Sequence, residues 1–286
     1  MRPVAETSTL RPAAVSVRDA LRDATRRLGG SSQTPRLDAE LLLAEVLGCR
    51  RERLILDRDQ VLERAHADRF AALLARRRAH EPIAYLLGRR DFRHLTLAVD
   101  PRVLIPRPET ELLVEVALEL TPGAAVLDVG TGSGAVALAL KDERPDLAVA
   151  GVDISAGAID LARANALALN LDVSFTVGDL LDGRRDRLDA VLANLPYVPD
   201  DAWLMDDVAR YEPSGALRGG SDGLQVVRRL VAMLAARPAG PRPGLLALEI
   251  GSEQGAAVAE LVRGVGYGAV QVLRDLAGFD RCVVGR

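Results

Sequence analysis

Residues 125–134 read Ala-Val-Leu-Asp-Val-Gly-Thr-Gly-Ser-Gly, an apolar run followed by three glycines in five positions. The apolar run at 125–129 predicts a buried strand, and the glycines predict a tight turn. The next residues, 135–140, are again apolar and predict the start of a helix. A strand, a tight turn and a helix in this order form the repeating unit of a parallel sheet, so this stretch predicts an α/β fold.

The same alternation continues to the end of the chain. Short apolar runs predict six further strands, at 147–152, 173–177, 188–193, 245–250, 269–273 and 281–284. Longer segments predict helices at 155–169, 224–236 and 254–265. Strands that alternate with helices pack as a doubly wound, mainly parallel sheet. We therefore expect a seven-stranded, Rossmann-like α/β domain over residues 106–286.

The first part of the chain has a different pattern. Residues 1–15 are rich in Pro, Thr and Ala without a period, which predicts disorder. Between 16 and 80 the apolar residues recur at helical spacing, which predicts a small bundle with helices at 17–28, 35–47, 51–56 and 59–80. The pattern changes again at Glu81-Pro82, and short apolar runs over 81–105 predict a β-hairpin that links the two domains.

Composition and charge argue against some classes of protein. The 286 residues carry a formal net charge of −3, which argues against a surface coated with basic residues for general nucleic-acid binding. The first 90 residues hold 18 arginines and 12 acids, a net charge of +6, and the remainder is acidic. This asymmetry fits either an N-terminal domain that meets an acidic or nucleic-acid-bearing partner, or a solvated helical surface.

Cysteine and histidine are too few and too scattered for a zinc site. The two cysteines are Cys49 and Cys282, and the three histidines are His66, His80 and His94. We therefore expect no metal. The N-terminus lacks an apolar signal core, and no uncharged apolar run approaches the length of a membrane span. These features predict a cytoplasmic protein without a membrane partner.

Candidate functional residues gather at the ends of the predicted strands. The glycine turn follows the first strand, Asp153 ends the second, Asp179 follows the third and Asn194 follows the fourth. Ligands of open parallel sheets bind outside the carboxyl ends of the strands. We therefore expect these residues to form one site.

The glycine turn consists of Gly130, Thr131, Gly132, Ser133 and Gly134. Glycines let a ligand approach the backbone closely, and the N-terminus of the following helix favours an anion. The pyrophosphate of a dinucleotide and the carboxylate of S-adenosylmethionine both suit such a turn.

Acidic residues at the next two strand ends complete a candidate cofactor site. Asp153 lies 23 residues beyond Gly130, where a carboxylate can accept hydrogen bonds from both hydroxyls of a ribose. Its alternative role is to cap the following helix. Asp179 is either an acceptor for the adenine amino group or a turn residue, and Leu180 would border the adenine ring.

The fourth strand ends in Asn194-Leu195-Pro196-Tyr197, a group suited to holding a planar amino group. The Asn194 side chain and the Leu195 backbone each offer a carbonyl, and the following proline biases residue 195 to extended geometry. Tyr197 offers a flat face for stacking. Two acceptors on one NH2 group orient its lone pair toward an electrophile, which suits methyl transfer better than hydride transfer. A strand followed by a polar turn is the alternative interpretation.

A loop with two prolines, at residues 104–111, precedes the sheet. Its rigid approach would let Arg107 or Glu109 face a cleft. The alternative is a structural linker that opens a capped helix.

Several segments together resemble the HemK-type protein-glutamine methyltransferases, which modify peptide chain release factors. The resemblance covers nearly all of the chain from about residue 16 to the end. It rests on Glu-Pro-Ile-Ala-Tyr-Leu-Leu-Gly at 81–88, Leu-Ile-Pro-Arg-Pro-Glu-Thr-Glu at 104–111, the glycine turn at 127–134, Asn-Leu-Pro-Tyr at 194–197, segments within 211–224, and Leu-Glu-Ile-Gly at 248–251.

The resemblance implies a helical N-terminal domain that helps to dock the release factor, and a methyltransferase domain. It implies methyl transfer from S-adenosylmethionine, with S-adenosylhomocysteine as product, to the side-chain amide nitrogen (N5) of the glutamine in the Gly-Gly-Gln loop of class 1 release factors. We further expect a monomer that does not bind nucleic acid directly.

The resemblance also implies roles for the candidate residues. The expected cofactor contacts are Gly130, Thr131, Gly132, Ser133, Gly134, Asp153, Asp179, Leu180 and Asn194. The expected substrate contacts are Arg107, Asn194, Leu195, Pro196 and Tyr197, and among them Asn194, Pro196 and Tyr197 are the expected catalytic residues. Two positions depart from the family pattern, which usually has proline where Leu195 stands and often an aromatic residue where Leu180 stands.

Two other functions compete with this one. Methylation of N6 of adenine or N4 of cytosine in DNA or RNA would use the same clamp, meaning the Asn194 and Leu195 carbonyls that accept from one amino group. It also requires base flipping and a basic reading surface. A nucleotide-binding regulator without catalysis would need the cofactor site alone.

Overall fold

The computed structural model describes residues 15–237 and 242–286. The chain divides into two units, the first ending at Leu87 and the second running from Gly88 to Arg286. The expectation of disorder over residues 1–15 falls, apart from Val15, outside the described residues. None of the helices in the described ranges is long and apolar enough to cross a membrane.

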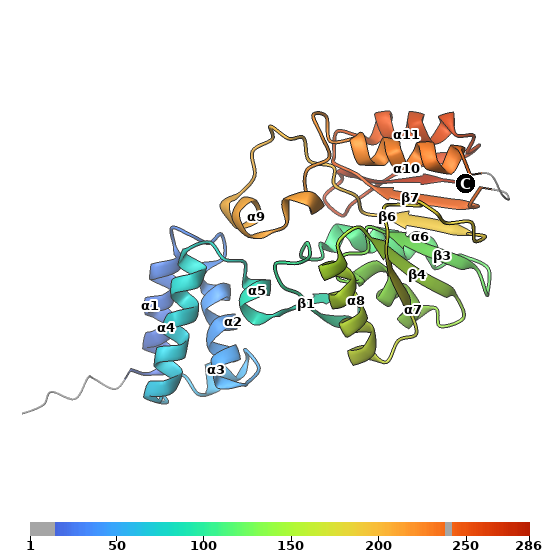
Figure 1. The fold of residues 1–286 in the computed structure, drawn as a ribbon. Helices are drawn as coiled ribbons and strands as arrows, with labels where there is room; N and C mark the ends of the chain where they lie inside the picture. Colours follow the sequence, from blue (N-terminus) through green and yellow to red (C-terminus); the bar gives the residue numbers. More distant parts are fainter. Residues whose placement is uncertain (1–14, 238–241) are drawn as a thin grey trace, which may run out of the picture. The chain divides into compact units, whose positions relative to one another are not determined.

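The described part of the first unit is built from helices that share one apolar core (Figure 1). They are α1 (Val17–Leu28), α2 (Pro35–Leu47), α3 (Arg53–Leu56), α4 (Arg64–Arg78) and α5 (Ile83–Leu87). Helix α1 begins where the Ser16 hydroxyl accepts a hydrogen bond from the Asp19 N–H (3.1 Å), and α2 ends where Gly48 adopts a φ of +61°. Both ends follow the standard chemistry of helix caps.

A buried ion pair joins α2 to α4. Arg77 Nε donates to Asp38 Oδ2 at 2.7 Å, and only 7% and 4% of these two residues are exposed. The hydroxyls of Ser32 and Thr34 also donate to the Asp38 carboxylate, at 2.7 and 3.1 Å. The carboxylate is thus paired and hydrogen-bonded, as a buried charge must be.

The structure moves several predicted boundaries in this region, and two of the changes are large. Helix α4 begins at Arg64 rather than at residue 59, because Val61 pairs with Ser16 in an antiparallel bridge. The hairpin predicted over 81–105 is confined to β1 (Arg89–Phe92) and β2 (Leu95–Ala98), while residues 83–87 form helix α5. Short apolar runs do not distinguish a helix from a strand by periodicity.

The second unit contains the predicted seven-stranded sheet (Figure 1). Its strands are β3 (Ala125–Val129), β4 (Ala148–Asp153), β5 (Ser174–Val177), β6 (Ala190–Ala193), β7 (Leu245–Glu249), β8 (Val270–Arg274) and β9 (Asp280–Gly285). Its helices are η1 (Pro108–Thr110), α6 (Glu111–Ala117), α7 (Ala135–Glu143), α8 (Ala156–Leu169), α9 (Asp206–Tyr211), η2 (Ser214–Ala216), α10 (Gln225–Ala235) and α11 (Gly255–Gly264).

The strand order is β5-β4-β3-β6-β7-β9-β8, and neighbouring strands are parallel except that β9 is antiparallel to β7 and β8. This arrangement confirms the predicted doubly wound, mainly parallel fold.

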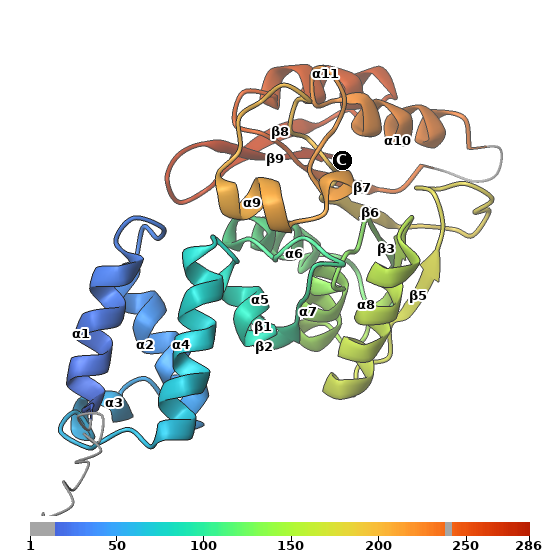
Figure 2. The ribbon, with the colours of Figure 1, turned by 60° about the vertical axis from the view of Figure 1, so that its left-hand side comes forward.

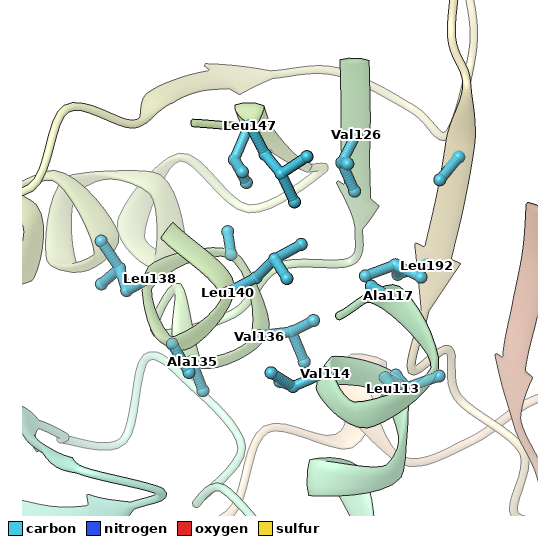
Figure 3. Packing of buried hydrophobic residues seen from close by; sticks show 14 of the residues in the cluster. Leu113, Val114, Ala117, Val126, Ala135, Val136, Leu138, Leu140, Leu147 and Leu192 are labelled. Atoms are coloured by element: carbon cyan, nitrogen blue, oxygen red, sulfur yellow. The ribbon is translucent and has the colours of Figure 1, made fainter. Parts of the chain in front are cut away.

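Apolar side chains on both faces of the sheet make it a buried layer. Val126 and Leu192 pack with α6, α7 and α8 in one cluster (Figure 3), whereas Leu127 and Val191 pack with α10 and α11 in another. Figure 2 shows the two helical layers on opposite sides of the sheet. Alternate residues of a strand point to opposite faces, so continuous apolar strands indicate a sheet covered on both sides.

The segment between β6 and α10 is more ordered than the sequence predicts. Helix α9 was not anticipated, and the loop before it carries Trp203, the single tryptophan of the chain, with 82% of its surface exposed. The loop backbone is fixed: Arg218 Nη1 donates to the Ala202 carbonyl at 2.9 Å, and the Asp200 N–H donates to the Gly220 carbonyl at 3.1 Å. Trp203 therefore projects from a held loop.

Candidate active site

The candidate site lies where the direction of strand addition reverses. Strand β3 has β4 on one side and β6 on the other, and such a switch point opens a crevice at the carboxyl ends of the strands. Val129 pairs with Ala193, so Gly130 and Asn194 leave the sheet side by side. A Cβ on Gly130, whose φ is +74°, would lie 3.3 Å from the Asn194 carbonyl oxygen. The switch point therefore brings the two main predicted motifs into contact.

A cavity of about 450 Å³ occupies this edge of the sheet. The predicted site residues that line it are Arg107, Gly130, Thr131, Gly132, Ser133, Asp153, Asp179, Leu180, Asn194, Leu195 and Pro196. Gly134 and Tyr197 are not among the residues that line it.

Two glycines of the turn have different tasks. A Cβ on Gly132 would meet no atom within 4 Å, so this residue leaves room for a ligand. A Cβ on Gly134 would lie 3.0 Å from Leu138 Cδ1 and from Phe175 Cζ. Gly134 therefore serves the close packing of the turn against the sheet, and both residues have a positive φ that favours glycine.

Asp128 fastens the turn from inside the protein. Its Oδ2 accepts hydrogen bonds from the Thr131 hydroxyl (2.6 Å) and the Ala137 N–H (3.3 Å), and only 2% of the residue is exposed. Burial raises the pKa of the Asp128 carboxyl to about 7, against the opposing effect of these two hydrogen bonds.

Asp153 reaches from the end of β4 to the glycine turn. Its Oδ2 accepts from the Gly132 N–H and its Oδ1 from the Ser155 N–H, both at 2.9 Å. The helix cap that was its alternative role belongs to Ser155, whose hydroxyl accepts from the Ala158 N–H at 3.2 Å. Each carboxylate oxygen can accept a further hydrogen bond from a ligand.

The end of β5 supplies Asp179 and Leu180. Asp179 Oδ2 forms an ion pair with Arg229 Nη2 at 2.6 Å, so part of its acceptor capacity is already used. Leu180 is 7% exposed and has a φ of +53°, a backbone region that is unfavourable for leucine. The cavity wall thus contains a strained residue at the predicted adenine position.

The Asn194 amide is held by a residue that the sequence analysis overlooked. Asn194 Nδ2 donates to the hydroxyl oxygen of Thr110 at 3.1 Å, and Thr110 is 4% exposed. An amide is planar, and with Nδ2 engaged it offers the cavity its Oδ1 acceptor.

Tyr197 does not line the cavity and is hydrogen-bonded to two residues of other segments. Its hydroxyl donates to Glu249 Oε1 at 3.3 Å, and its carbonyl accepts from Gln254 Nε2 at 3.0 Å. Glu249 ends β7 and is 2% exposed. Burial raises the pKa of the Glu249 carboxyl to about 7, while hydrogen bonds from Thr110 and Tyr197 oppose the shift.

Arg107 also lines the cavity, in the loop predicted either to face a cleft or to act as a linker. Its guanidinium donates to Glu212 Oε1, and Glu212 Oε2 accepts from the Ile105 N–H at 3.0 Å. Glu212 is 6% exposed, so a buried carboxylate fixes this loop. Glu109 is not among the residues that line the cavity.

The groups around the cavity suit a ligand with both an anionic and a cationic part. Helix α7 begins at Ala135, and its N-cap residue, Gly134, has no side chain to cap it, which leaves backbone N–H groups for an anion. Asp128, Asp153 and Asp179 lie around the same cavity and favour a positive charge and hydroxyl groups. S-adenosylmethionine carries a carboxylate, ribose hydroxyls and a sulfonium, so the residues present fit it.

Comparison with known proteins also points to a methyltransferase. The N-terminal domain model named PrmC matches residues 19–88, and the methyltransferase small domain model matches residues 108–210. A release factor glutamine methyltransferase of Moorella thermoacetica is 45% identical over 280 residues, which covers 94% of this chain and 97% of that protein. The chain belongs to the release factor glutamine methyltransferase family. The enzyme is therefore an S-adenosylmethionine-dependent methyltransferase.

Other relatives extend this picture of the methyltransferase. A release factor glutamine methyltransferase of Burkholderia pseudomallei is 44% identical over 263 residues, covering 87% of this chain and 91% of that protein. The catalytic domain of hMettl16, in complex with an RNA hairpin, shares the fold with a TM-score of 0.52 and 15% identity, covering 71% of this chain and 79% of that one. Nucleobase methylation, the alternative from the sequence, is not favoured by these relatives, which match most of the chain.

Proposed function

We propose that this enzyme transfers a methyl group from S-adenosylmethionine to the side-chain amide nitrogen of the glutamine in the Gly-Gly-Gln loop of class 1 release factors. One observation carries the proposal. The Asn194 amide stands beside the glycine turn with its Nδ2 bound to Thr110, so that its Oδ1 is the group available to a substrate NH2.

The proposed cofactor contacts follow from the cavity. The turn at Gly130–Gly134 and the start of α7 would bind the carboxylate of the cofactor, Asp153 the ribose hydroxyls, and Asp179 with Leu180 the adenine. Bound S-adenosylmethionine supplies a methyl group activated by its sulfonium. The protein then has only to hold the acceptor nitrogen in line with it.

The clamp would make a poor nucleophile competent. The lone pair of an amide nitrogen is delocalised into its carbonyl, which weakens it as a nucleophile. Asn194 Oδ1 and the Leu195 carbonyl would accept the two N–H bonds of the glutamine and turn that lone pair toward the methyl group. Arg107, fixed by Glu212, is proposed to contact the loop that carries the glutamine.

Tyr197 is proposed to act by support rather than by stacking. Its hydroxyl is bound to Glu249, and the residue does not line the cavity. Pro196 lines the cavity and constrains the Leu195 carbonyl before it. We further propose that the enzyme acts in the cytoplasm, since its proposed substrate acts in translation. We also propose that it is a monomer, and sedimentation would test this oligomeric state.

The test is incubation with S-adenosylmethionine and a purified release factor, followed by peptide mass mapping. We expect a single methyl group on the glutamine of the Gly-Gly-Gln loop. Asn194→Ala should lower turnover by about a hundredfold or more and leave the affinity for S-adenosylhomocysteine nearly unchanged. Leu276→Ala, at a fully exposed residue far along the chain, is the control and should behave as wild type. No methyl group on that glutamine, with cofactor still bound, would redirect the search to nucleic-acid amino groups.

A further inference from the structure

The segment at residues 198–211 is held in place although it contributes no buried residue to the core. It follows Tyr197 and includes α9, and Figures 1 and 2 show it as a long excursion from the sheet. The Val198 N–H donates to the Leu217 carbonyl, and the Gly219 N–H donates to the Val198 carbonyl, both at 2.9 Å. Ordering a backbone costs conformational entropy, so an ordered segment that packs no core is expected to have another task.

Arg218 holds the part of this segment that carries Trp203. Its Nη1 donates to the carbonyls of Pro199 and Ala202, at 2.5 and 2.9 Å. The Asp200 N–H is hydrogen-bonded as well. The backbone before Trp203 is therefore tied at several points, while the residue itself is 82% exposed. A large aromatic side chain on a fixed backbone loses little freedom when a partner covers it.

Two glycines join the base of the 198–211 segment to the residues of the clamp. A Cβ on Gly219 would lie 2.3 Å from the Pro196 carbonyl oxygen, and a Cβ on Gly223 would lie 2.1 Å from the Tyr197 carbonyl oxygen. Glycine is needed at both positions because backbone packs directly against backbone there. Since Gly219 is also hydrogen-bonded to Val198, the base of the segment and the end of the clamp form one rigid piece.

The 198–211 segment is bordered at both ends by the cavity. It begins two residues after Pro196 and ends two residues before Pro213, and both prolines line the cavity. Gly215 and Ala216 line it as well. A small substrate would not extend beyond the cavity, whereas a protein that inserts one side chain must also cover the surface around it. The 198–211 segment is part of that surface.

The side chains beside the tryptophan in sequence indicate the chemistry of a partner. Asp200 and Asp201 are exposed, and neither forms an ion pair with any residue in the described ranges. Helix α9 adds Asp206 and Asp207 in its first turn, so the 198–211 segment carries four aspartates and a single arginine. An exposed tryptophan with acidic neighbours suits a partner surface that offers an apolar pocket and basic side chains.

We propose that the 198–211 segment is a docking surface for the release factor, and that Trp203 enters an apolar pocket with a basic rim beside the Gly-Gly-Gln loop. This inference rests on the proposed function and adds to it a contact outside the cavity. One glutamine side chain offers few contacts, so binding at a second surface helps to hold the loop in the clamp. A second copy of this chain fits less well, because two copies of the 198–211 segment would bring like charges together.

The test measures binding of the full-length enzyme to a purified release factor. Isothermal titration calorimetry, with S-adenosylhomocysteine present, gives the dissociation constant. We expect this constant to rise about tenfold or more in Trp203→Ala, because an aromatic anchor is lost. Leu167→Ala is the matched control, since it shortens an 84% exposed side chain near the end of α8, and it should stay within about twofold of wild type.

A second variant tests whether the loop must be held. Arg218→Met removes the hydrogen bonds to the Pro199 and Ala202 carbonyls and leaves Trp203 in place. We expect the dissociation constant for the release factor to rise about threefold or more, because the tryptophan is no longer preorganised. The affinity for S-adenosylhomocysteine should stay within about twofold of wild type in both variants, since neither Trp203 nor Arg218 lines the cavity.

The charges are tested by salt. Attraction between exposed charges is screened by ions, so the wild-type dissociation constant should rise between about 0.05 and 0.2 M NaCl. The double variant Asp200→Asn and Asp201→Asn should show a weaker dependence on salt. Asp172→Asn removes another exposed carboxylate, in the loop before β5, and should keep the wild-type dependence.

Three results would overturn the inference. The first is an unchanged dissociation constant for the release factor in Trp203→Ala. The second is a lower melting temperature of Trp203→Ala together with weaker binding of S-adenosylhomocysteine, which would give Trp203 a role in the fold. The third is sedimentation of the wild type as a dimer and of Trp203→Ala as a monomer, which would make the segment a contact between copies. Failure of the proposed function looks different, because the wild-type enzyme would then neither bind nor methylate the release factor.

Discussion

At the scale of single residues, Leu195 shows how packing can replace a covalent restraint. Its side chain is 4% exposed, and its Cδ2 lies 3.1 Å from the position that a Cβ on Gly130 would take. A proline ring would restrict φ at this position, whereas leucine restricts the backbone by filling the space beside the glycine turn. The direction of the Leu195 carbonyl therefore depends on the core.

Leu195→Ala should expose that dependence. The lost methyl groups leave a cavity, so we expect the free energy of unfolding to fall by about 2–5 kcal/mol and turnover to fall with it, because the carbonyl loses its support. Urea unfolding followed by circular dichroism and a methylation assay measure the two effects. Wild-type stability in this variant would show that Leu195 does not hold the strand end. Leu276→Ala serves as the exposed control.

At the scale of elements, the helices and strands that could be predicted from the sequence were those whose ends carry a local sequence signal. Strand β3 and helix α8 were predicted to within one residue, since glycine and Ser155 mark their ends. Helix α5 was missed, because an apolar run of five residues carries no clear period. The Gly130 turn, Asp153 and Asn194 were predicted as site residues because each lies at the end of a predicted strand.

Contacts between distant segments were beyond prediction. The bond between Asn194 and Thr110 joins residues 84 positions apart, and no local pattern predicts such a pairing. Glu249 ends a strand like Asn194, so a survey of every polar strand end would have found it. The role of Glu212 depends on the fold of the loop at 104–111 and carries no signal of its own.

The turn between β3 and α7 should make stability depend on pH. The pKa of Asp128 is about 7 in the folded protein and 3.8 by reference, so the neutral carboxyl favours the folded state below about pH 4. This contribution is lost as pH rises through 7. Asp128→Asn cannot ionise and should lose less stability between pH 5 and pH 8 than wild type does, as measured by urea unfolding. An equal loss would contradict the assignment; Glu260→Gln, exposed on α11, is the control.

At the scale of the whole molecule, the two units are stabilised by different kinds of interaction. The second unit has two large apolar clusters on either face of its sheet. The first has one smaller cluster and relies in addition on the buried pair of Asp38 and Arg77. A change in that pair should therefore act on the stability of the helical unit and not on the cavity.

Asp38→Ala should destabilise the helical unit by about 3–5 kcal/mol, because it leaves the Arg77 charge buried and unpaired. The affinity for S-adenosylhomocysteine should stay within about twofold of wild type, since the lining of the cavity lies wholly in the second unit. Circular dichroism melts and calorimetry measure the two quantities. Asp23→Ala, which breaks exposed ion pairs on α1, should cost less than about 1 kcal/mol. A large drop in cofactor affinity for Asp38→Ala would show that the two units are coupled.

The lone tryptophan has a spectroscopic consequence. The indole of Trp203 is exposed to solvent in the folded protein, so its fluorescence emission already resembles that of a tryptophan in an unfolded chain. Intrinsic tryptophan fluorescence would then barely register the collapse of the sheet. The same isolation makes 5-fluorotryptophan a label with one ¹⁹F resonance, placed six residues beyond Tyr197 on a held loop. The chain thus carries one tryptophan, on the loop that follows the clamp in sequence, whose emission changes little on unfolding and whose ¹⁹F-labelled form would report on the surroundings of that loop.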